Sequence, residues 1–514
     1  SCQIIGTGIY VFSDTQDFNL EIVEEDLMRC FQSSVNDVQN LPNQCKNGYI
    51  VKIANSRMSD EDDYYLRFEG EGGDGVGSWA ECAKPGIAKT LTNMPLVIQR
   101  TAFNTNTQVA TFTVKQFTYA DRRVGDDNTN PLPSFVGKRI NKVLFFRNRL
   151  VFLSGENVIT SRPGTLGTPD FFAETALTIS ASDPVDISAA STFPSELFDG
   201  IEVNTGLVVF STNQQFLLAA DDTVFNPDTA KLRSIATFNY NETIAPISLG
   251  TTVAYVDNSG KFSRFNEMAN IQREGEPNVV EVSKVVPTLL PKNIDLLTNS
   301  RENSIVLMGQ KHVAVFGTPN TTTPDSDTVY GYKYFQVSEQ RQQAAWFKWK
   351  LNNPLVYHFI INDEYFFLDT DYFLQSIKLV QTETDPFITQ DNVDFLLHLD
   401  NQVKISKGTA SYNPSTNVTT FPTNWLTDVN SPNYDLVVID VNRDHNQFPT
   451  PDVGRYAKAN YIAQNSVGTS TNSSFTLPGD WRGPSNVYLT VGYIYDYEVK
   501  FPTFYATRRE GNNS

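Results

Sequence analysis

The residues with the clearest chemical potential form a basic cluster between positions 138 and 149. Lysine and arginine side chains contact nucleic-acid phosphates, so such a cluster could bind DNA or RNA. The alternative is structural, because an arginine inside an apolar strand needs a partner and an unpaired buried charge is costly. Arg149 directly precedes an apolar run, and we favour the structural role, in which it pairs with an acid between two sheets. The cluster comprises Lys138, Arg139, Lys142, Arg147 and Arg149.

Other motifs with chemical potential lack residues that the chemistry needs. The glycine-rich run at 70–77 has neither the GK[ST] ending of a P-loop nor the strand–GxGxxG–helix setting of a dinucleotide fold, and it predicts a hairpin loop. The acidic turn at 60–63 lacks calcium-loop spacing, which favours a solvated turn. With no GxSxG motif and four scattered histidines, no Ser-His-Asp set can be identified. Paired carboxylates for glycoside cleavage stay open, because the 58 acidic residues allow many pairs.

The cysteine pattern gives little support to a zinc site. All four cysteines lie in the first 82 residues, none forms a CxxC pair, and no histidine is close in sequence. We expect buried thiols, with a disulfide inside the group as the open alternative. These motifs therefore predict no catalytic residue that can be named, no cofactor and no metal.

Charge and length limit the class of protein. The net charge of −18 and the pI of about 4.7 are opposite to those of a free nucleic-acid-binding domain. An acidic wall would repel DNA, which is useful only where DNA must pass without sticking. A length of 514 residues predicts two to four domains. No apolar run approaches 18 residues, so no membrane-spanning helix is expected. A start at Ser1, without methionine or signal peptide, suggests an internal segment of a longer chain.

The elements that position the basic cluster begin at a sharp boundary. Turn residues from Gly125 lead to Pro131 and Pro133, which remove backbone donors and favour extended chain, as in a linker that ends one unit. Two apolar strands follow, at 143–146 and 150–153, and a polar turn leads to a short third strand.

This strand pattern recurs along the chain. Four apolar residues end at Ser, Asp or Gly, and a polar turn and another short strand follow, at offsets of 57, 46, 52 and 60 residues. Continuous apolar runs indicate strands buried on both faces. A hairpin repeated about every 50 residues favours the blades of a β-propeller over a β-sandwich with fortuitous spacing. The repeated strands are 150–154, 207–211, 253–257, 305–309 and 365–369, and the strands expected after them are Val158-Ile159, Phe216-Leu217, Phe262, Val313–Val315 and Phe373-Leu374.

We therefore expect a mainly β protein in three parts. Residues 131–385 form a β-propeller of five to six blades, and residues 386–514 form a β-rich rim module. Residues 1–130 form a small α+β domain, part of a longer N-terminal region. Its helix is expected at Asp14–Val35, where Leu20, Val23, Leu27 and Phe31 recur at spacings of three and four and Asp17 could cap the N-terminus.

Ordered motifs across about 300 residues resemble the tail nozzle proteins (tail tubular protein B) of short-tailed phages, the podoviruses. The similarity is strongest in the segment 125–162 and weak after residue 385. Further landmarks stand at 48–53, 64–65, 79–81, 94–95, 183–186 and 341–346. The family-motif residues are Pro133, Ser134, Phe135, Gly137, Arg147, Asn148, Arg149, Leu150, Ser154, Gly155, Glu156, Asn157, Ser161 and Arg162.

The resemblance implies a structural protein of the virion tail that is not an enzyme. Members form a six-fold ring with copies of themselves below the tail adaptor ring protein. They continue the channel that carries double-stranded DNA without sequence-specific binding, and they help dock the tail fibre protein. The family motif carries no catalytic residues, so the residues above are expected to be framework. The alternatives are a propeller-type glycan-binding or glycan-cleaving tail protein and a sequence-independent DNA-binding module, which the net charge disfavours.

Overall fold

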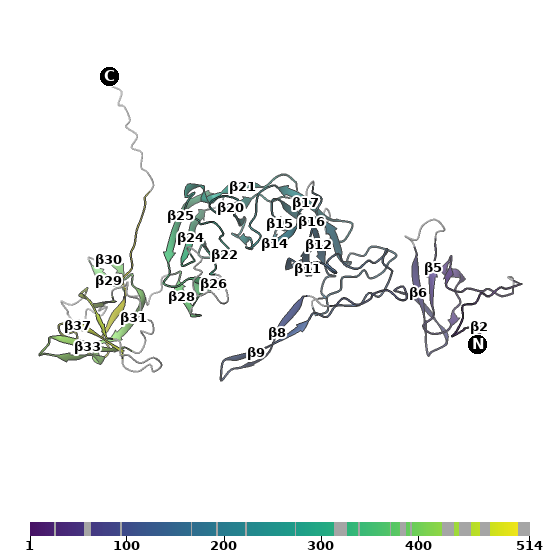
Figure 1. Ribbon diagram of the computed structural model, residues 1–514, viewed down its shortest axis with the longest axis horizontal. Coiled ribbons are helices and arrows are strands. Elements are labelled where there is room, and N and C mark those ends of the chain that lie inside the picture. The colour runs from purple at the N-terminus through teal and green to yellow at the C-terminus, as the bar shows by residue number, and fades with distance from the viewer. Residues whose placement is uncertain are drawn as a thin grey trace, which may run out of the picture. The chain divides into compact units, whose positions relative to one another are not determined.

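The computed structural model is β throughout its described part (Figure 1). The only helical segments among the described residues are short 3₁₀ turns, η1 (Val38–Asn40), η2 (Val282–Val285) and η3 (Lys407–Thr409). The chain divides into two compact units, Ser1–Ile377 and Lys378–Ser514. The structure describes residues 1–514 apart from 25–26, 56–62, 93–94, 166, 192–193, 221–223, 273, 313–325, 338–339, 371, 381–386, 391–392, 424–435, 441–453, 463–472 and 502–514.

The N-terminal part of the first unit is built on one five-stranded sheet and two separate ribbons. The sheet has the order β3-β5-β6-β7-β4, and Val51, Ile53 and Leu66 form its small core. Its strands are β3 (Ser34–Val35), β4 (Gln44–Cys45), β5 (Ile50–Ile53), β6 (Tyr64–Gly70) and β7 (Gly75–Cys82). The ribbons are β1 (Cys2–Ile5) with β2 (Gly8–Val11), and β8 (Leu96–Asn104) with β9 (Val109–Gln116). The glycine-rich run joins β6 to β7, which confirms the predicted hairpin loop.

The helix predicted at Asp14–Val35 is wrong. The described residues of this span form irregular chain and then strand β3. The expected apolar stripe lies in solvent, with Leu20, Val23 and Leu27 exposed by 51%, 93% and 85%. A helical pattern becomes a helix in a protein mainly when its apolar face packs against something. Here only Phe31 packs on the sheet, against Tyr49 and Trp79. The described N-terminal region is therefore β and not α+β.

The repeated strands belong to five consecutive antiparallel sheets, named here repeat sheets 1 to 5. Each is formed by strands in chain order, so every sheet is one uninterrupted meander. Their strands are β10 (Lys142–Phe146), β11 (Arg149–Ser154), β12 (Asn157–Thr160) and β13 (Val185–Ser188); β14 (Leu197–Val203), β15 (Gly206–Ser211), β16 (Gln215–Ala220) and β17 (Ala230–Ala236); β18 (Ile247–Ser248), β19 (Val253–Asp257), β20 (Arg264–Ala269) and β21 (Asn278–Glu281); β22 (Leu296–Ser300), β23 (Ile305–Gly309), β24 (Thr328–Val337) and β25 (Gln340–Lys350); and β26 (Leu355–Ile361), β27 (Glu364–Asp369) and β28 (Leu374–Lys378).

All five predicted repeat strands occupy the same place, the second strand of a repeat sheet: β11, β15, β19, β23 and β27. In the first four every residue is buried, as a continuous apolar run predicts. In β27 burial alternates, so one face of repeat sheet 5 is less covered.

The predicted positions of the strands that follow the repeat strands were less accurate. The prediction is confirmed at Val158-Ile159 and Phe216-Leu217, which lie in β12 and β16. Phe262 precedes β20, and Phe373 precedes β28, which begins at Leu374. Val313–Val315 lie outside the described residues, and β24 is the third strand of that sheet.

The first four repeat sheets pack face to face through apolar cores, and repeat sheet 5 contacts repeat sheet 4. Sheets 1 and 2 share a core around Val151 and Phe216, and sheets 2 and 3 share one around Phe210 and Tyr255. Sheets 3 and 4 meet at Phe265 and Tyr332, among other side chains. Sheets 4 and 5 meet where β22 lies against β26 and where the rings of Trp349 and Tyr365 lie 6.0 Å apart.

The second unit has its own β core, centred on Phe421, Phe475 and Trp481. A buried ion pair joins Lys407 to Asp440. The strand orders are β31-β38-β34-β35, β32-β33-β37-β36 and β29-β30. Their bounds are β29 (Phe387–Gln390), β30 (Val393–Leu396), β31 (Asp400–Ser406), β32 (Ser411–Asn413), β33 (Val418–Thr423), β34 (Leu436–Asp440), β35 (Tyr456–Lys458), β36 (Asn460–Ile462), β37 (Ser473–Pro478) and β38 (Tyr488–Tyr493).

A buried histidine in repeat sheet 5 predicts acid sensitivity. His358 is 3% exposed, and its Nδ1 lies 3.0 Å from the hydroxyl of Tyr365. Burial lowers the pKa of His358 from 6.5 to about 3. Between these values the unfolded chain binds a proton that the folded chain does not, so stability falls as pH falls from about 6.5 towards 3. We expect a loss on the order of 4 kcal/mol in the free energy of unfolding. Urea unfolding at pH 7, 5 and 4 measures it.

The matched variant is His358→Gln, which cannot titrate. Its free energy of unfolding should depend less steeply on pH than that of the parent chain. Equal pH slopes for the two proteins would contradict the assignment.

Candidate functional site

The family-motif residues meet at the entry to repeat sheet 1, where the preceding linker, the first hairpin and the start of repeat sheet 2 come together. Arg149 is buried, with 3% exposure. Its guanidinium donates to four backbone carbonyl oxygens, those of Ser161 (3.0 Å), Asp183 (2.6 Å), Ala181 (3.0 Å) and Phe225 (3.1 Å). Phe225 lies between β16 and β17, so this contact joins repeat sheet 1 to repeat sheet 2.

The acidic partner predicted for Arg149 is therefore wrong, since the acceptors are carbonyl groups. A guanidinium offers five N–H donors in a plane and can satisfy several carbonyls at once. Asp183, which accepts from Arg149 through its backbone carbonyl, uses its carboxylate elsewhere, accepting from the backbone N–H groups of Glu174 and Ser180. Burial lowers the pKa of Arg149, and the charge of Asp183 opposes that shift.

The rest of the basic cluster does not converge on a common point. Lys142 forms an ion pair of 2.5 Å with Asp199 of β14. Arg147 is exposed, with its guanidinium over the rings of Phe146 and Phe225 at 5.5 and 5.7 Å. Lys138 and Arg139 are exposed. Two of the five side chains thus bind within the protein, and a third stacks on its surface.

The turn between β10 and β11 explains the pair Arg147-Asn148. Phe146 and Arg149 face each other, which leaves a two-residue loop. Both loop residues have positive φ, 49° and 59°, which is the geometry of the type I′ turn that suits the twist of a tight hairpin. The carbonyl oxygen of Asn148 also accepts from the N–H of Gly164.

Ser134 and Asn157 meet at the carboxylate of Asp186 in β13. It accepts from the N–H and hydroxyl of Ser134, at 2.8 and 2.7 Å, and from the side-chain amide of Asn157, at 3.1 Å. The linker is thereby hydrogen-bonded to two strands of repeat sheet 1.

Phe135 anchors an aromatic cap over the outer face of repeat sheet 1. Its ring lies 5.0 Å from Phe152 in β11, 5.1 Å from Phe171 and 6.2 Å from Tyr119. Pro133 is buried beside it, and Gly137, with φ of +76°, turns the chain away.

The turn at Gly155-Glu156 holds the start of repeat sheet 2. The carbonyl oxygen of Gly155 accepts from the N–H of Leu197 at 2.8 Å, and the carboxylate of Glu156 accepts from the N–H of Ser195 at 3.2 Å. The remaining motif residues also bond within this region. Ser154 donates to the carbonyl of Arg139, Ser161 accepts from the N–H of Leu150, and Arg162 pairs with Glu174 and Asp170.

Sequence reasoning missed Arg122, which is 1% exposed. It donates to the carbonyl oxygens of Ala88 and Asn130 and to the carboxylate of Asp127, and it lies over the ring of Phe172. The segment predicted as a linker is thus a buried polar junction. Arg122 has no apolar run around it, and only the Asp and Asn turn formers that follow it hint at such a role.

Glu81, part of a predicted landmark, ties the N-terminal sheet to the same region. Its carboxylate accepts from the hydroxyl of Thr175 at 2.6 Å and from the N–H of Ala176 at 2.7 Å. Gly125 shows how closely two segments of the chain approach each other in this region. Its φ is +75°, and a Cβ at this position would lie 2.8 Å from the Cβ of Asn130.

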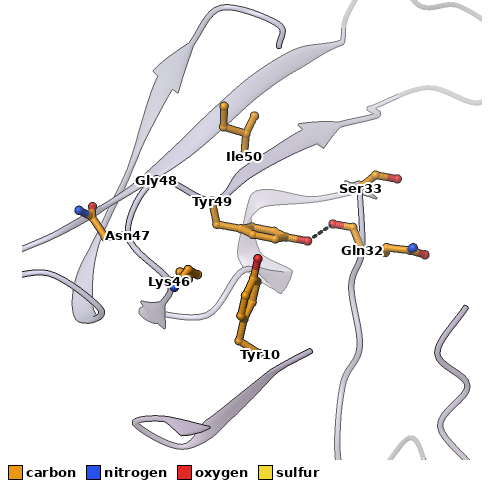
Figure 2. A pocket seen from close by; sticks show the side chains of 8 residues that line it. All are labelled: Tyr10, Gln32, Ser33, Lys46, Asn47, Gly48, Tyr49 and Ile50. Atoms are coloured by element: carbon orange, nitrogen blue, oxygen red, sulfur yellow. Dashed lines mark hydrogen bonds between the residues drawn. The ribbon is translucent and has the colours of Figure 1, made fainter. Parts of the chain in front are cut away.

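Figure 2 shows a shallow pocket beside the N-terminal sheet, lined by Tyr10, Gln32, Ser33, Lys46, Asn47, Gly48, Tyr49 and Ile50. The two tyrosine rings meet edge to face at 5.9 Å, and the Tyr49 hydroxyl donates to the carbonyl oxygen of Gln32 at 2.5 Å. Lys46 lies over Tyr10 and pairs with Asp74. No acid, thiol or histidine lines the pocket, and its titratable side chains are those of Lys46, Tyr10 and Tyr49.

The described residues include no group of three or more His, Cys, Asp or Glu side chains that could hold a metal ion. The four cysteines are free, and Cys2 and Cys30 are exposed, contrary to the expected burial. Within the acidic turn, residues 60–62 lie outside the described part. Asp63 is buried and pairs with Lys52 at 2.5 Å, so it is not a solvated carboxylate. No helix in the described part is long and apolar enough to span a membrane.

The Arg149 contacts predict a large loss of stability on substitution. Arg149→Met removes the donors of four bonds and leaves their carbonyl oxygens buried, so we expect it to lower the free energy of unfolding by about 3 kcal/mol. Arg147→Met is the matched control, two positions away and exposed, and should cost about 1 kcal/mol or less. Urea unfolding of both variants measures the difference. Equal costs would show that the carbonyl contacts of Arg149 add nothing.

The family model described as bacteriophage nozzle protein matches residues 11–514. The tail tubular protein gp12 of Escherichia phage T7 is 24% identical over 483 residues, which cover 92% of this chain and 55% of that protein. The chain thus spans about half the length of this relative.

Solved structures give weaker likenesses. Hsv2p of Kluyveromyces lactis is 9% identical, with a TM-score of 0.30 over 60% of this chain and 84% of that chain. BamB of Moraxella catarrhalis is 11% identical, with a TM-score of 0.26 over 61% and 78%. TM-scores this low carry no argument about the fold. The family model, by contrast, covers nearly the whole chain. The chain therefore belongs to the bacteriophage nozzle protein family, and its place is in the tail of the virion.

Proposed function

We propose that this chain is a subunit of the tail nozzle ring, in which six copies form the distal conduit for genome ejection. The observation that carries the proposal is the match to the nozzle family over residues 11–514. The site supports it, because the family-motif residues bond to one another and to the chain around them. Such contacts hold elements in place. We propose no enzymatic activity.

The five repeat sheets support a β-propeller of five or six blades over residues 131–385. Each of the first four has four strands in chain order, and these four sheets pack face to face in consecutive pairs. These are features of propeller blades. Residues 1–130 and 386–514 would be the β-rich parts that flank it.

The charge of the chain suits a conduit. A net charge of −18 provides no excess of phosphate-neutralising groups, so DNA can pass without binding. The partners we propose are further copies of the chain, the tail adaptor ring protein above, the tail fibre protein at the side, and double-stranded DNA without sequence-specific contacts.

A second candidate function is glycan binding by a propeller-type tail protein. The pocket lined by Tyr10 and Tyr49 favours binding over cleavage, because sugars stack on aromatic rings and no carboxylate lines the pocket. Incubation with host polysaccharide tests it. Retention of the polysaccharide without release of reducing ends would support binding, and release of reducing ends would require a cleaving site elsewhere.

The ring predicts a defined mass and symmetry. Native mass spectrometry of the purified protein should show a species of six chains, each of 57.6 kDa for the sequence given, and electron microscopy should show six-fold rings. The adaptor ring protein is added if the ring forms only on its partner. A chain that stays monomeric with and without the adaptor would contradict the proposal.

A further inference from the structure

Two parts of the first unit have separate apolar cores, and strand β7 leads from one part to the other. The five-stranded N-terminal sheet draws its core from residues 31–79, and the core beneath the aromatic cap of repeat sheet 1 draws on residues 91–172. Cys82 is the last residue of β7 that pairs within the N-terminal sheet. The next residue, Ala83, already forms a bridge to Gly125 in front of repeat sheet 1. The chain therefore passes from one part to the other between two consecutive residues.

The backbone after β7 makes the first connection between the two parts. Beside the bridge from Ala83 to Gly125, the N–H of Lys84 donates to the carbonyl oxygen of Gly125 at 2.9 Å. Parts of a chain that are joined at a narrow place move relative to each other unless a large apolar interface holds them. A backbone connection at one place fixes where the N-terminal sheet is attached, but the sheet can still turn about it.

The carboxylate of Glu81 makes the second connection. One of its oxygens accepts from the hydroxyl of Thr175 at 2.6 Å, and the other accepts from the N–H of Ala176 at 2.7 Å. Hydrogen bonds to an ionised acceptor are roughly twice as strong as bonds between neutral groups. Both donors lie in the connection between β12 and β13, in a loop of residues 173–176 that we name the socket loop. The sheet is thus attached at two places, and a turn about the first would break the bonds at the second.

The socket loop is itself fixed to the framework of repeat sheet 1. The side chain of Asn130 accepts from the N–H of Ala173 at 3.0 Å and donates to the carbonyl oxygen of Ala173 at 3.4 Å. The N–H of Glu174 donates to the carboxylate of Asp183 at 3.1 Å. Asn130 and Asp183 are buried, with 4% and 3% exposure. The donors that face Glu81 therefore keep their place when the N-terminal sheet turns.

We propose that the peptide between Cys82 and Ala83 is a hinge, and that the carboxylate of Glu81 is the latch that holds the N-terminal sheet at one angle to repeat sheet 1. Hinges commonly consist of a few residues at the end of an element, as here at the end of β7. Glu81 is a positioning residue, because the sheet has its own core and the latch sets only its direction. The inference goes beyond the proposed function, since it concerns a single chain and needs no ring.

The distance between two spin labels, measured by pulsed electron paramagnetic resonance, tests the latch. One label is attached at Val76→Cys, which is exposed and lies at the end of β7 away from the hinge. The other is attached at Arg233→Cys, which is exposed in β17 of repeat sheet 2. The native thiols that are not buried are replaced by serine, and buried Cys82 is kept; those replaced are Cys2, Cys30 and Cys45. In the parent chain we expect one narrow distribution of distances.

Three variants of this labelled chain separate the latch from other effects. Glu81→Ala removes both acceptors and should widen the distribution about twofold or more. Glu81→Gln keeps an oxygen for the N–H of Ala176, and its amide can donate to the hydroxyl oxygen of Thr175, so its width should lie between those of the parent and Glu81→Ala. Glu69→Ala is the matched control, because Glu69 is an exposed acid of the same sheet that pairs with Arg67 on the surface. It should leave the distribution unchanged.

Two results would overturn the latch. Equal widths for Glu81→Ala and the parent chain would do so: if both are narrow, other contacts hold the angle, and if both are wide, the two bonds do not hold it. Unfolding of the N-terminal sheet in Glu81→Ala, seen as a fall in melting temperature that Glu69→Ala does not show, would mean that Glu81 stabilises the sheet and does not set its direction. Neither result bears on the proposed function, which the mass and symmetry of the ring test separately.

Discussion

A buried guanidinium has to have its N–H groups bonded, and the entry to the repeat sheets is arranged around that constraint. Arg149 stands at the start of a strand in which every residue is buried, so water cannot satisfy it. Its four acceptors come from the end of β12, the turn before β13 and the loop between β16 and β17. Three segments far apart in sequence are thereby fixed to one side chain. Arg122 solves the same problem in the preceding segment, where it gathers Ala88, Asn130 and Asp127.

The apolar faces impose a second constraint, which concerns what covers each sheet. Each repeat sheet buries both faces of its second strand only if another element lies on each side. Repeat sheet 1 obtains its outer cover from the segment before it, through Tyr119 and Phe135, and from the connection between β12 and β13, through Phe171. The polar junction at Arg122 and the hydrogen bonds of Ser134 to Asp186 hold these segments in place. The buried polar groups hold the segments that carry the aromatic cap. The polar groups and the cap therefore depend on each other.

Structure could be predicted from the sequence where a pattern has a single physical cause. It could not be predicted where the structure also depends on a second condition that the pattern does not show. Continuous apolar runs such as 207–211 have one explanation, burial on both faces, and all five proved to be second strands of sheets. The spacing of Leu20, Val23 and Leu27 fits a helix, but a helix also needs a surface to pack on, and the sequence does not show that this surface is missing.

The candidate site, like the fold, could be predicted only in part. That Arg149 needs partners could be predicted from its burial. Its partners are carbonyl oxygens because three turns that are distant in sequence end beside it. The contacts of Arg122 depend in the same way on the path of residues 84–91. These contacts arise from the fold itself, so no local pattern announces them.

The directional character of hydrogen bonds also explains why so many polar groups between residues 142 and 155 bond inside the protein. Apolar packing rewards burial at many angles, whereas a hydrogen bond weakens steeply when its geometry changes. Arg149 to Phe225, Lys142 to Asp199 and Gly155 to Leu197 each cross from repeat sheet 1 to repeat sheet 2 or its entry. Together they set the angle between the two sheets, which the shared apolar core alone would leave adjustable. In the ring that we propose, that angle has to be the same in every copy, because a small error in each would add up around the ring.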